Sequence, residues 1–151
     1  MPDEGKLGEM GLLSKIMFWR RRRSVVPVVR LSGVISQSGS LGRRGLSLES
    51  VEPQLKKAFS VKRAKAVAII INSPGGSPVQ SSLIGQRIRD LANRADVPVL
   101  AFCEDVAASG GYWLAASADE IYANPSSVIG PIGGISAGFG FDKAIAKLGI
   151  D

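Results

Sequence analysis

The sequence predicts an α/β fold with a mainly parallel β-sheet. Short apolar runs rich in β-branched residues alternate with segments in which apolar residues recur at helical spacing. The runs at residues 67–71 and 97–102 are continuously apolar, as is typical of strands buried inside a parallel sheet. The 151 residues include 18 glycines and 45% hydrophobic residues, which fits one globular domain rather than a disordered or fibrous chain.

Residues 1–23 are predicted to form a basic tail outside the domain, which is expected to span residues 24–151. The four arginines at 20–23 follow an apolar stretch at 11–19, which is too short to cross a bilayer because a spanning helix needs about 20 residues. The charge follows the apolar part, whereas a secretory signal carries its charge first. Two interpretations stay open: an interfacial helix on anionic lipid, or a solvated tail. Nothing beyond this block indicates a nucleic-acid partner.

The domain is expected to begin with a strand, a loop and a helix. Residues 25–31 are β-rich, and Pro27 within them favours an edge position or the start of a strand. A loop is expected at 36–46 and a helix at 47–59, with Pro53 in its first turn. The apolar face of this helix is predicted to be Val51, Leu55, Ala58 and Phe59.

A second helix is predicted after the strand at 67–71. Ser77 is a suitable N-cap and Pro78 a suitable first residue for a helix that runs to about Asn93. Its apolar stripe is predicted to be Val79, Leu83, Ile84, Ile88 and Leu91. Its solvated face is predicted to be Gln86, Arg87, Arg89 and Asp90.

The rest of the domain is expected to continue the alternation. The predicted elements are a strand at 97–102, a short helix at 109–118, a strand at 120–123, a glycine-rich apolar stretch at 126–140 and a last helix at 141–148. Trp113 is more typical of a core or subunit contact than of a substrate contact. Ser126 and Ser127 either cap a turn or hydrogen-bond a catalytic base.

The residue counts exclude several kinds of catalytic site. The chain contains no histidine, which removes the Ser-His-Asp triad, the Cys-His dyad and almost every zinc site. We therefore expect no metal and no other cofactor. Cys103 is the single cysteine, so it cannot form an internal disulfide, and we interpret it as core packing. A serine nucleophile here would need another base, for which lysine is the usual residue.

Two turns, each between an apolar strand and a helix, are the candidate site. Gly75 and Gly76 follow the first strand, and Ser109, Gly110 and Gly111 follow the second. A glycine turn that opens a helix leaves backbone N–H groups free for an anion or an oxyanion. The carboxyl ends of parallel strands lie at one edge of the sheet, where sites gather. Ser109 is either a nucleophile or a plain N-cap, and the glycines are either donors or simply required by a tight turn.

Four motifs stand out: Asn-Ser-Pro-Gly-Gly-Ser at 72–77, Ser-Gly-Gly-Tyr at 109–112, Ala-Asn-Pro at 123–125 and Gly-Pro-Ile-Gly at 130–133. Together they resemble the signal peptide peptidase A family, bacterial serine peptidases with a Ser/Lys dyad. The resemblance extends from about Val25 to Asp151 and implies the Clp/crotonase-like spiral of ββα units. It also implies that Ser109 is the nucleophile and that the N–H groups around Gly75, Gly76 and Gly110 form the oxyanion hole.

The resemblance places the general-base lysine beyond Asp151. Lys143 and Lys147 are interpreted as the polar face of the last helix, not as the base. We therefore expect the chain to be the N-terminal part of a longer peptidase. Alone, it should hydrolyse peptides poorly unless a partner subunit supplies the lysine.

The leading prediction is a serine endopeptidase that acts on unfolded or signal peptides. The resemblance implies a homo-oligomer in the bacterial cytoplasm or at the periphery of the cytoplasmic membrane. Two alternatives stay open. One is a crotonase-like acyl-CoA enzyme, which would not need Ser109. The other is a pseudo-peptidase that binds peptides or assembles subunits without catalysis.

Overall fold

A computed structural model describes residues 24–37 and 45–133. The elements in chain order are β1 (Val28–Ser32), α2 (Leu48–Phe59), β2 (Val67–Ser73), α3 (Pro78–Ala95), β3 (Val99–Ala107), α4 (Gly110–Ala116), β4 (Glu120–Ala123) and β5 (Val128–Ile129). Every strand pairing in these ranges is parallel, so the predicted α/β class is confirmed. The predicted tail at 1–23 and the predicted helix at 141–148, with Lys143 and Lys147, lie outside the described residues.

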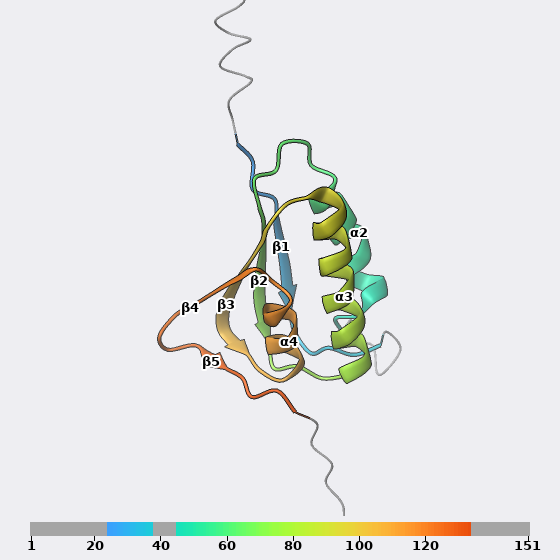
Figure 1. The fold of residues 1–151 in the computed structure, drawn as a ribbon. Helices are drawn as coiled ribbons and strands as arrows, with labels where there is room; N and C mark the ends of the chain where they lie inside the picture. The colour runs from blue at the N-terminus through green and yellow to red at the C-terminus, as the bar shows by residue number, and fades with distance from the viewer. Residues whose placement is uncertain (1–23, 38–44, 134–151) are drawn as a thin grey trace, which may run out of the picture.

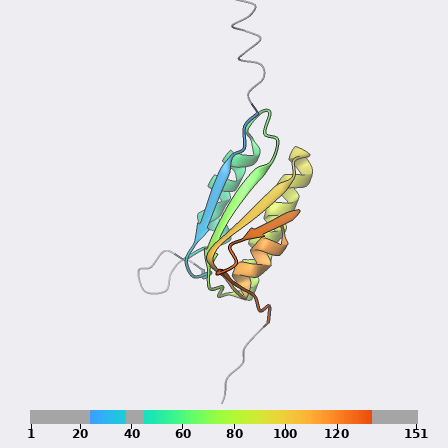
Figure 2. The same ribbon diagram turned by 90° about the vertical axis from the view of Figure 1, so that its left-hand side faces the viewer.

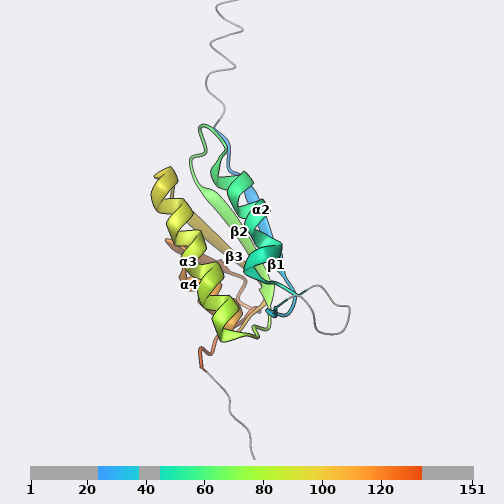
Figure 3. The same cartoon turned by 90° about the vertical axis from the view of Figure 1, so that its right-hand side faces the viewer.

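The strands form one sheet in the order β1-β2-β3-β4, with β5 also paired to β3. The first half of β3 pairs with β4, and its last residues, Val106 and Ala107, pair with β5. Helices α2, α3 and α4 lie together on one face of this sheet (Figures 1, 2 and 3). Pro27 directly precedes β1, which lies at one edge of the order, as the sequence predicts. No helix within the described ranges is long and apolar enough to cross a membrane.

Helix α2 begins where a pair of serines caps it. The Ser47 hydroxyl accepts from the Ser50 amide, and the Ser50 hydroxyl accepts from the Ser47 amide. Because the helix begins at Leu48, Pro53 falls in the second turn rather than the predicted first turn. Both Pro53 and Glu49, whose carbonyl loses its helical partner there, are exposed, so water can replace the missing bond. The predicted buried face is confirmed: Val51, Leu55, Ala58 and Phe59.

The buried face of α3 differs from the predicted stripe. Ile84 and Ile88 are fully buried, but Val79 is 65% exposed and Leu83 is 39% exposed. The buried residues of this helix are Ser81, Ile84, Gly85, Ile88 and Ala92. Small residues occupy this face because α4 packs closely against it. A Cβ added to Gly85 would lie 3.4 Å from the Trp113 ring.

Two arginines of α3 that we predicted to be solvated instead hold neighbouring elements. The Arg87 guanidinium binds both carboxylate oxygens of Glu52 on α2, with its Nη2 atom 2.7 Å from Oε1. This contact, helped by Lys56, holds the pKa of the Glu52 carboxyl below its ordinary value. Arg89 reaches the segment after α4 and is described with the site. The spacing of apolar residues along α3 could not predict these contacts, because the acidic partner of each arginine lies outside this helix.

Strand β3 is longer than the sequence predicts. We expected it to end at residue 102, with Glu104–Val106 as a connector, but it continues to Ala107. Its last two residues gain parallel partners from β5, and Ala107 also pairs with Ser73 of β2. The extension places the end of β3 directly before the Ser109 turn. Cys103 is buried in the core, as predicted, and burial raises the pKa of its thiol.

Candidate active site

Ser109 occupies a strained turn between β3 and α4. Its backbone has φ 49° and ψ −119°, a region that residues other than glycine rarely adopt. Such strain costs about 1–3 kcal/mol and is concentrated at functional sites. Ser109 stands at the N-cap position of α4, but its side chain makes no capping hydrogen bond. The Ser109 hydroxyl therefore does not accept a hydrogen bond from the first turn of α4, as the hydroxyl of an N-cap serine ordinarily does.

Main-chain hydrogen bonds hold this turn from both sides. The Ser109 amide donates to the Pro131 carbonyl at 2.8 Å, and the Ala108 amide donates to the Ser73 carbonyl at 3.1 Å. The Gly130 amide donates to the Ala107 carbonyl at 3.0 Å. The segment after β5 and the end of β2 thus fix the position of the serine.

The Gly75 turn touches the Ser109 turn directly. Gly75 is buried with φ 93°, and Gly76 follows with φ 144°. A Cβ added to Gly75 would lie 2.8 Å from the Ser109 Cβ and 2.7 Å from the Gly110 nitrogen, closer than real side chains approach. Glycine is therefore required at position 75 both for its backbone conformation and for the contact. The two turns singled out from the sequence lie side by side, as the carboxyl ends of neighbouring parallel strands do.

Two main-chain N–H groups beside Ser109 have no acceptor among the described residues. They belong to Gly76 and Gly110, both of which line the same pocket as Ser109. The amides of Ser109 and Gly75 are already bonded: that of Ser109 to the Pro131 carbonyl and that of Gly75 to the Ser73 hydroxyl, at 3.1 Å. Of the three glycines predicted as donors, Gly75 thus contributes close contact rather than a free N–H group.

A pocket of about 140 Å³ opens beside Ser109. It is lined by Gly76, Pro78, Ser81, Ser109, Gly110, Trp113, Ile132 and Gly133. Trp113 is 42% exposed and also lines a neighbouring pocket of about 310 Å³, with Ala116, Ser117 and Ile132. The Trp113 side chain therefore borders open space next to the serine rather than the core. The lining supplied by the described residues contains no titratable side chain.

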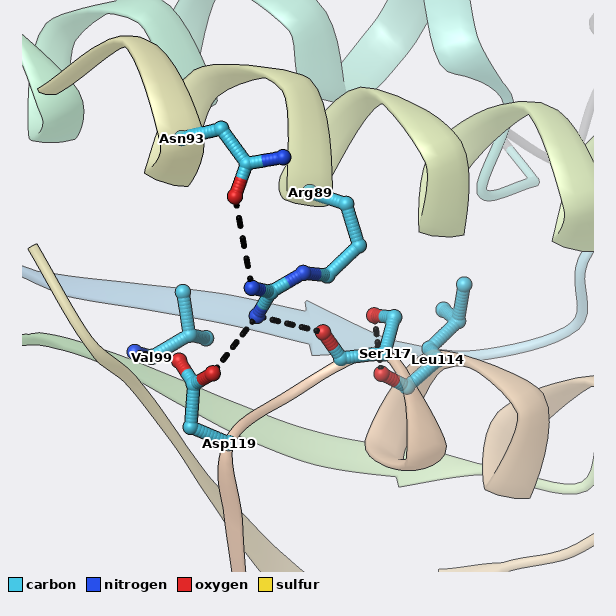
Figure 4. A network of polar contacts seen from close by, with 6 residues as sticks. All are labelled: Arg89, Asn93, Val99, Leu114, Ser117 and Asp119. Carbon is cyan, nitrogen blue, oxygen red and sulfur yellow. Dashed lines mark hydrogen bonds and ion pairs between the residues drawn. The ribbon is translucent and has the colours of Figure 1, made fainter. Parts of the chain in front are cut away.

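Figure 4 shows the contacts between Arg89 of α3 and the segment that follows the C-terminal end of α4. Arg89 donates to the Ser117 carbonyl at 3.3 Å and to the Asp119 carboxylate at 3.0 Å. The other Asp119 oxygen accepts from the Val99 amide at 2.7 Å. These contacts, that of Val99 above all, hold the pKa of the Asp119 carboxyl below its ordinary value. The helix that begins at Ser109 is thus anchored at its C-terminal end as well.

Sequence reasoning missed two buried serines beside the site. Ser73 and Ser81 are both fully buried, and their hydroxyls bond to main-chain carbonyls of Gly33 and Ser77. In the sequence both are small polar residues, and nothing near them in the chain indicates that they are buried. Ser126 and Ser127, for which two roles were open, take part in a turn: the Ser127 hydroxyl accepts from the Asn124 amide at 3.1 Å, and the Asn124 side chain accepts from the Ser126 amide at 2.9 Å.

The fold and the site together define a class of protein. A parallel α/β domain presents a serine that makes no cap hydrogen bond, beside two main-chain N–H groups that no acceptor in residues 24–37 and 45–133 satisfies. That arrangement suits acyl transfer through a serine nucleophile and an oxyanion hole.

Comparison with known proteins gives the family. The family model of peptidase family S49 matches residues 92–151. The serine protease SPPA, chloroplastic, of Arabidopsis thaliana is 35% identical over 132 residues, which cover 85% of this chain and 19% of that protein. The chain belongs to peptidase family S49, the signal peptide peptidase A family, as its motifs predict.

A second relative carries a different name. A Brucella melitensis protein named Na(+)/H(+) antiporter NhaA is 54% identical over 144 residues, which cover 93% of this chain and 19% of that protein. The chain thus spans about a fifth of the length of each of these relatives. The antiporter name refers to a protein of which four-fifths lies outside the match, and it is not transferred to this chain.

One solved structure supports the fold. It is a mutant of a protein described as the 1510-N membrane-bound stomatin-specific protease, and it matches with a TM-score of 0.54 and 21% identity. The match covers 78% of this chain and 54% of the other. At this identity the likeness bears on the fold alone, and it agrees with the α/β class predicted from the sequence.

Proposed function

We propose that the protein is a serine endopeptidase of the signal peptide peptidase type, with Ser109 as its nucleophile. The observation that carries the proposal is the contact between the strained Ser109 turn and the Gly75 turn, because it brings beside the serine two N–H groups that have no acceptor among the described residues. The Ser109 oxygen attacks the scissile carbonyl of a peptide. The oxyanion that forms accepts hydrogen bonds from the Gly76 and Gly110 amides. When this tetrahedral intermediate collapses, the C–N bond breaks, the amine product leaves and an acyl-enzyme remains. Water then hydrolyses the acyl-enzyme.

The proton acceptor in this proposal is a neutral lysine amine. The chain contains no histidine, and the described lining of the Ser109 pocket holds no titratable group. A lysine can act as a base near neutral pH where desolvation lowers the pKa of its ammonium. The family resemblance supports a lysine from beyond Asp151, in the same or a neighbouring subunit. We therefore propose that Ser109 is only weakly activated in this chain by itself.

The substrates are proposed to be unfolded peptides, including signal peptides. An extended peptide can reach the main-chain donors because Gly76 is exposed and carries no side chain. The apolar lining from Trp113 and Ile132 suits an apolar substrate side chain next to the scissile bond. We further propose a homo-oligomer in the bacterial cytoplasm or at the periphery of the cytoplasmic membrane, where the basic residues at 20–23 would contact anionic lipid.

The nucleophile is tested by reaction with a fluorophosphonate. The serine oxygen forms a bond to phosphorus, fluoride leaves and the hydroxyl proton passes to solvent. Intact-mass and peptide-mass measurements should show one adduct, on Ser109, that forms faster in the folded chain than in urea. The Ser109→Ala variant should lose this adduct. The matched control Ser126→Ala removes an exposed serine of a turn and should keep it.

Two outcomes would contradict the proposal. One is an adduct that persists in Ser109→Ala. The other is a Ser109 that reacts no faster in the folded chain than in urea, even when the lysine-bearing region is supplied. The second outcome would favour the alternatives without a serine nucleophile, namely a peptide-binding protein or a crotonase-like acyl-CoA enzyme.

A further inference from the structure

Ser73 is a buried polar residue in contact with both turns of the site. It is the last residue of β2 and is fully buried. Its hydroxyl donates to the Gly33 carbonyl at 2.7 Å and accepts from the Gly75 amide at 3.1 Å. One side chain therefore connects the end of β1 to the Gly75 turn.

The main chain of Ser73 connects to the serine turn. The Ser73 carbonyl accepts from the Ala108 amide at 3.1 Å, one residue before Ser109. A Cβ added to Gly111 would lie 2.4 Å from the same carbonyl oxygen, so the start of α4 packs directly on Ser73. Ser73 thus touches the segment that carries Ser109 and the segment that carries the Gly76 N–H group.

The Gly75 turn needs an outside restraint to keep its shape. Glycine has the widest choice of backbone conformations, so two glycines in succession do not favour any one conformation by themselves. On one side, the Ile35 amide donates to the Gly75 carbonyl at 2.8 Å, and the Ile35 carbonyl accepts from the Ser77 amide at 2.7 Å. On the other side, the Ser73 hydroxyl holds the Gly75 amide.

We propose that Ser73 is a positioning residue: its hydroxyl fixes the Gly75 amide and so orients the next N–H group, that of Gly76, toward the Ser109 pocket. This inference rests on the proposed function for its effect on chemistry. Ser73 itself is fully buried and is not among the residues that line the pocket. Its loss should therefore weaken stabilisation of the oxyanion without weakening the binding of a peptide.

The test compares three variants of the chain. Ser73→Ala removes the hydroxyl, and Ser73→Thr keeps it. Ser47→Ala is the matched control, because Ser47 is also a buried serine whose hydroxyl accepts from a main-chain amide, but at the start of α2. Amide hydrogen exchange measured by NMR reports on the Gly75 N–H group directly. The rate of Ser109 modification by a fluorophosphonate reports on the site.

We expect Ser73→Ala to speed exchange at the Gly75 amide and to slow Ser109 modification about 10-fold to 100-fold, up to the cost of misplacing a catalytic group by about 1 Å and less than that of losing a donor outright. Peptide binding, followed by Trp113 fluorescence in a Trp19→Phe background, should change less than about threefold, since the pocket lining is intact. Ser73→Thr should restore both the exchange rate and the modification rate. Ser47→Ala should lower stability but leave Ser109 modification unchanged.

Three results would overturn the inference. They are an unchanged exchange rate at Gly75 in Ser73→Ala, an unchanged Ser109 modification rate in that variant, and equal losses in Ser73→Ala and Ser73→Thr. Failure of the proposed function is separate, because Ser109 of the unsubstituted chain would then react no faster in the folded state than in urea, even when the lysine-bearing region is supplied. In that case the exchange measurement still decides whether the Ser73 hydroxyl holds the turn.

Discussion

The Ser109 amide donates a 2.8 Å hydrogen bond to the Pro131 carbonyl, so the serine's own N–H group is not free to meet a substrate. The donors nearest the nucleophile must come from its neighbours, and Gly76 and Gly110 have free N–H groups among the described residues. The same bond joins the segment after β5 to the turn after β3. The candidate site is thus assembled from three loops that follow three strands of one sheet.

Gly75→Ala should abolish the reactivity of Ser109. The added Cβ would lie 2.8 Å from the Ser109 Cβ and from the Ala108 carbonyl oxygen, and the backbone at φ 93° disfavours any side chain. The two turns would have to separate, which moves the Gly76 donor away from the serine. We expect at least about a 100-fold loss in the rate of fluorophosphonate modification, together with about 1–3 kcal/mol of stability.

Gly33→Ala is the control for backbone strain alone. Gly33 also has a positive φ, 105°, but an added Cβ there would meet nothing within 4 Å. This variant should lose about 1 kcal/mol of stability and keep most of the Ser109 reactivity. Equal losses of reactivity in the two variants would show that the Gly75 contact has no special role.

Gly110→Ala should be destabilising, chiefly because of Ser81. The new Cβ would lie 2.2 Å from the Ser81 hydroxyl oxygen and 3.2 Å from the Ser81 Cβ. We expect a loss of about 1–3 kcal/mol in urea unfolding, typical of an overpacked site. Adding Ser81→Gly removes both Ser81 atoms, which leaves the Ile35 Cδ1 atom at 3.1 Å, and should return about half or more of that loss, which a double-mutant cycle measures. Strictly additive effects would contradict this origin.

The fold and the meeting of the two turns could be predicted from the sequence because both follow from local patterns. Apolar runs predict the strands, and glycines after two parallel strands predict turns at one edge of the sheet. The end of β3 could not be predicted, because β5 lengthens that strand from far along the chain. The same limit hid Ser73, whose hydroxyl partner, Gly33, lies 40 residues away. Side-chain roles set by such distant contacts leave no periodic signal.

Asp119→Ala should weaken the protein at neutral pH and much less in acid. The Val99 amide, and then Arg89, hold the pKa of this carboxyl below its ordinary value in the folded state. A lowered pKa means that the charged form stabilises the fold above the ordinary pKa, and that this contribution is lost as the pH falls through the folded value. Because the side chain is 40% exposed, we expect only about 1 kcal/mol.

The measurement for Asp119 is urea unfolding of both proteins at several pH values. The difference in unfolding free energy should be constant near neutral pH and shrink as the pH falls from about 5 toward 2. Asp90→Ala, which removes an exposed acidic residue of α3, is the control. A difference that stays constant into acid would mean that the charge of Asp119 contributes nothing.

Leu83 and Ile84 are neighbours on α3 that the sequence placed on one apolar stripe, and they should differ sharply when truncated. Ile84 is fully buried in the core, whereas Leu83 is 39% exposed. Ile84→Ala should cost about 2–5 kcal/mol, because it removes apolar contacts and leaves a cavity. Leu83→Ala should cost less than about 1 kcal/mol, since water already reaches the side chain. Urea unfolding of both variants checks this ordering. Equal losses would mean that Leu83 is covered in solution, as it would be if a second copy of the chain packed on the start of α3.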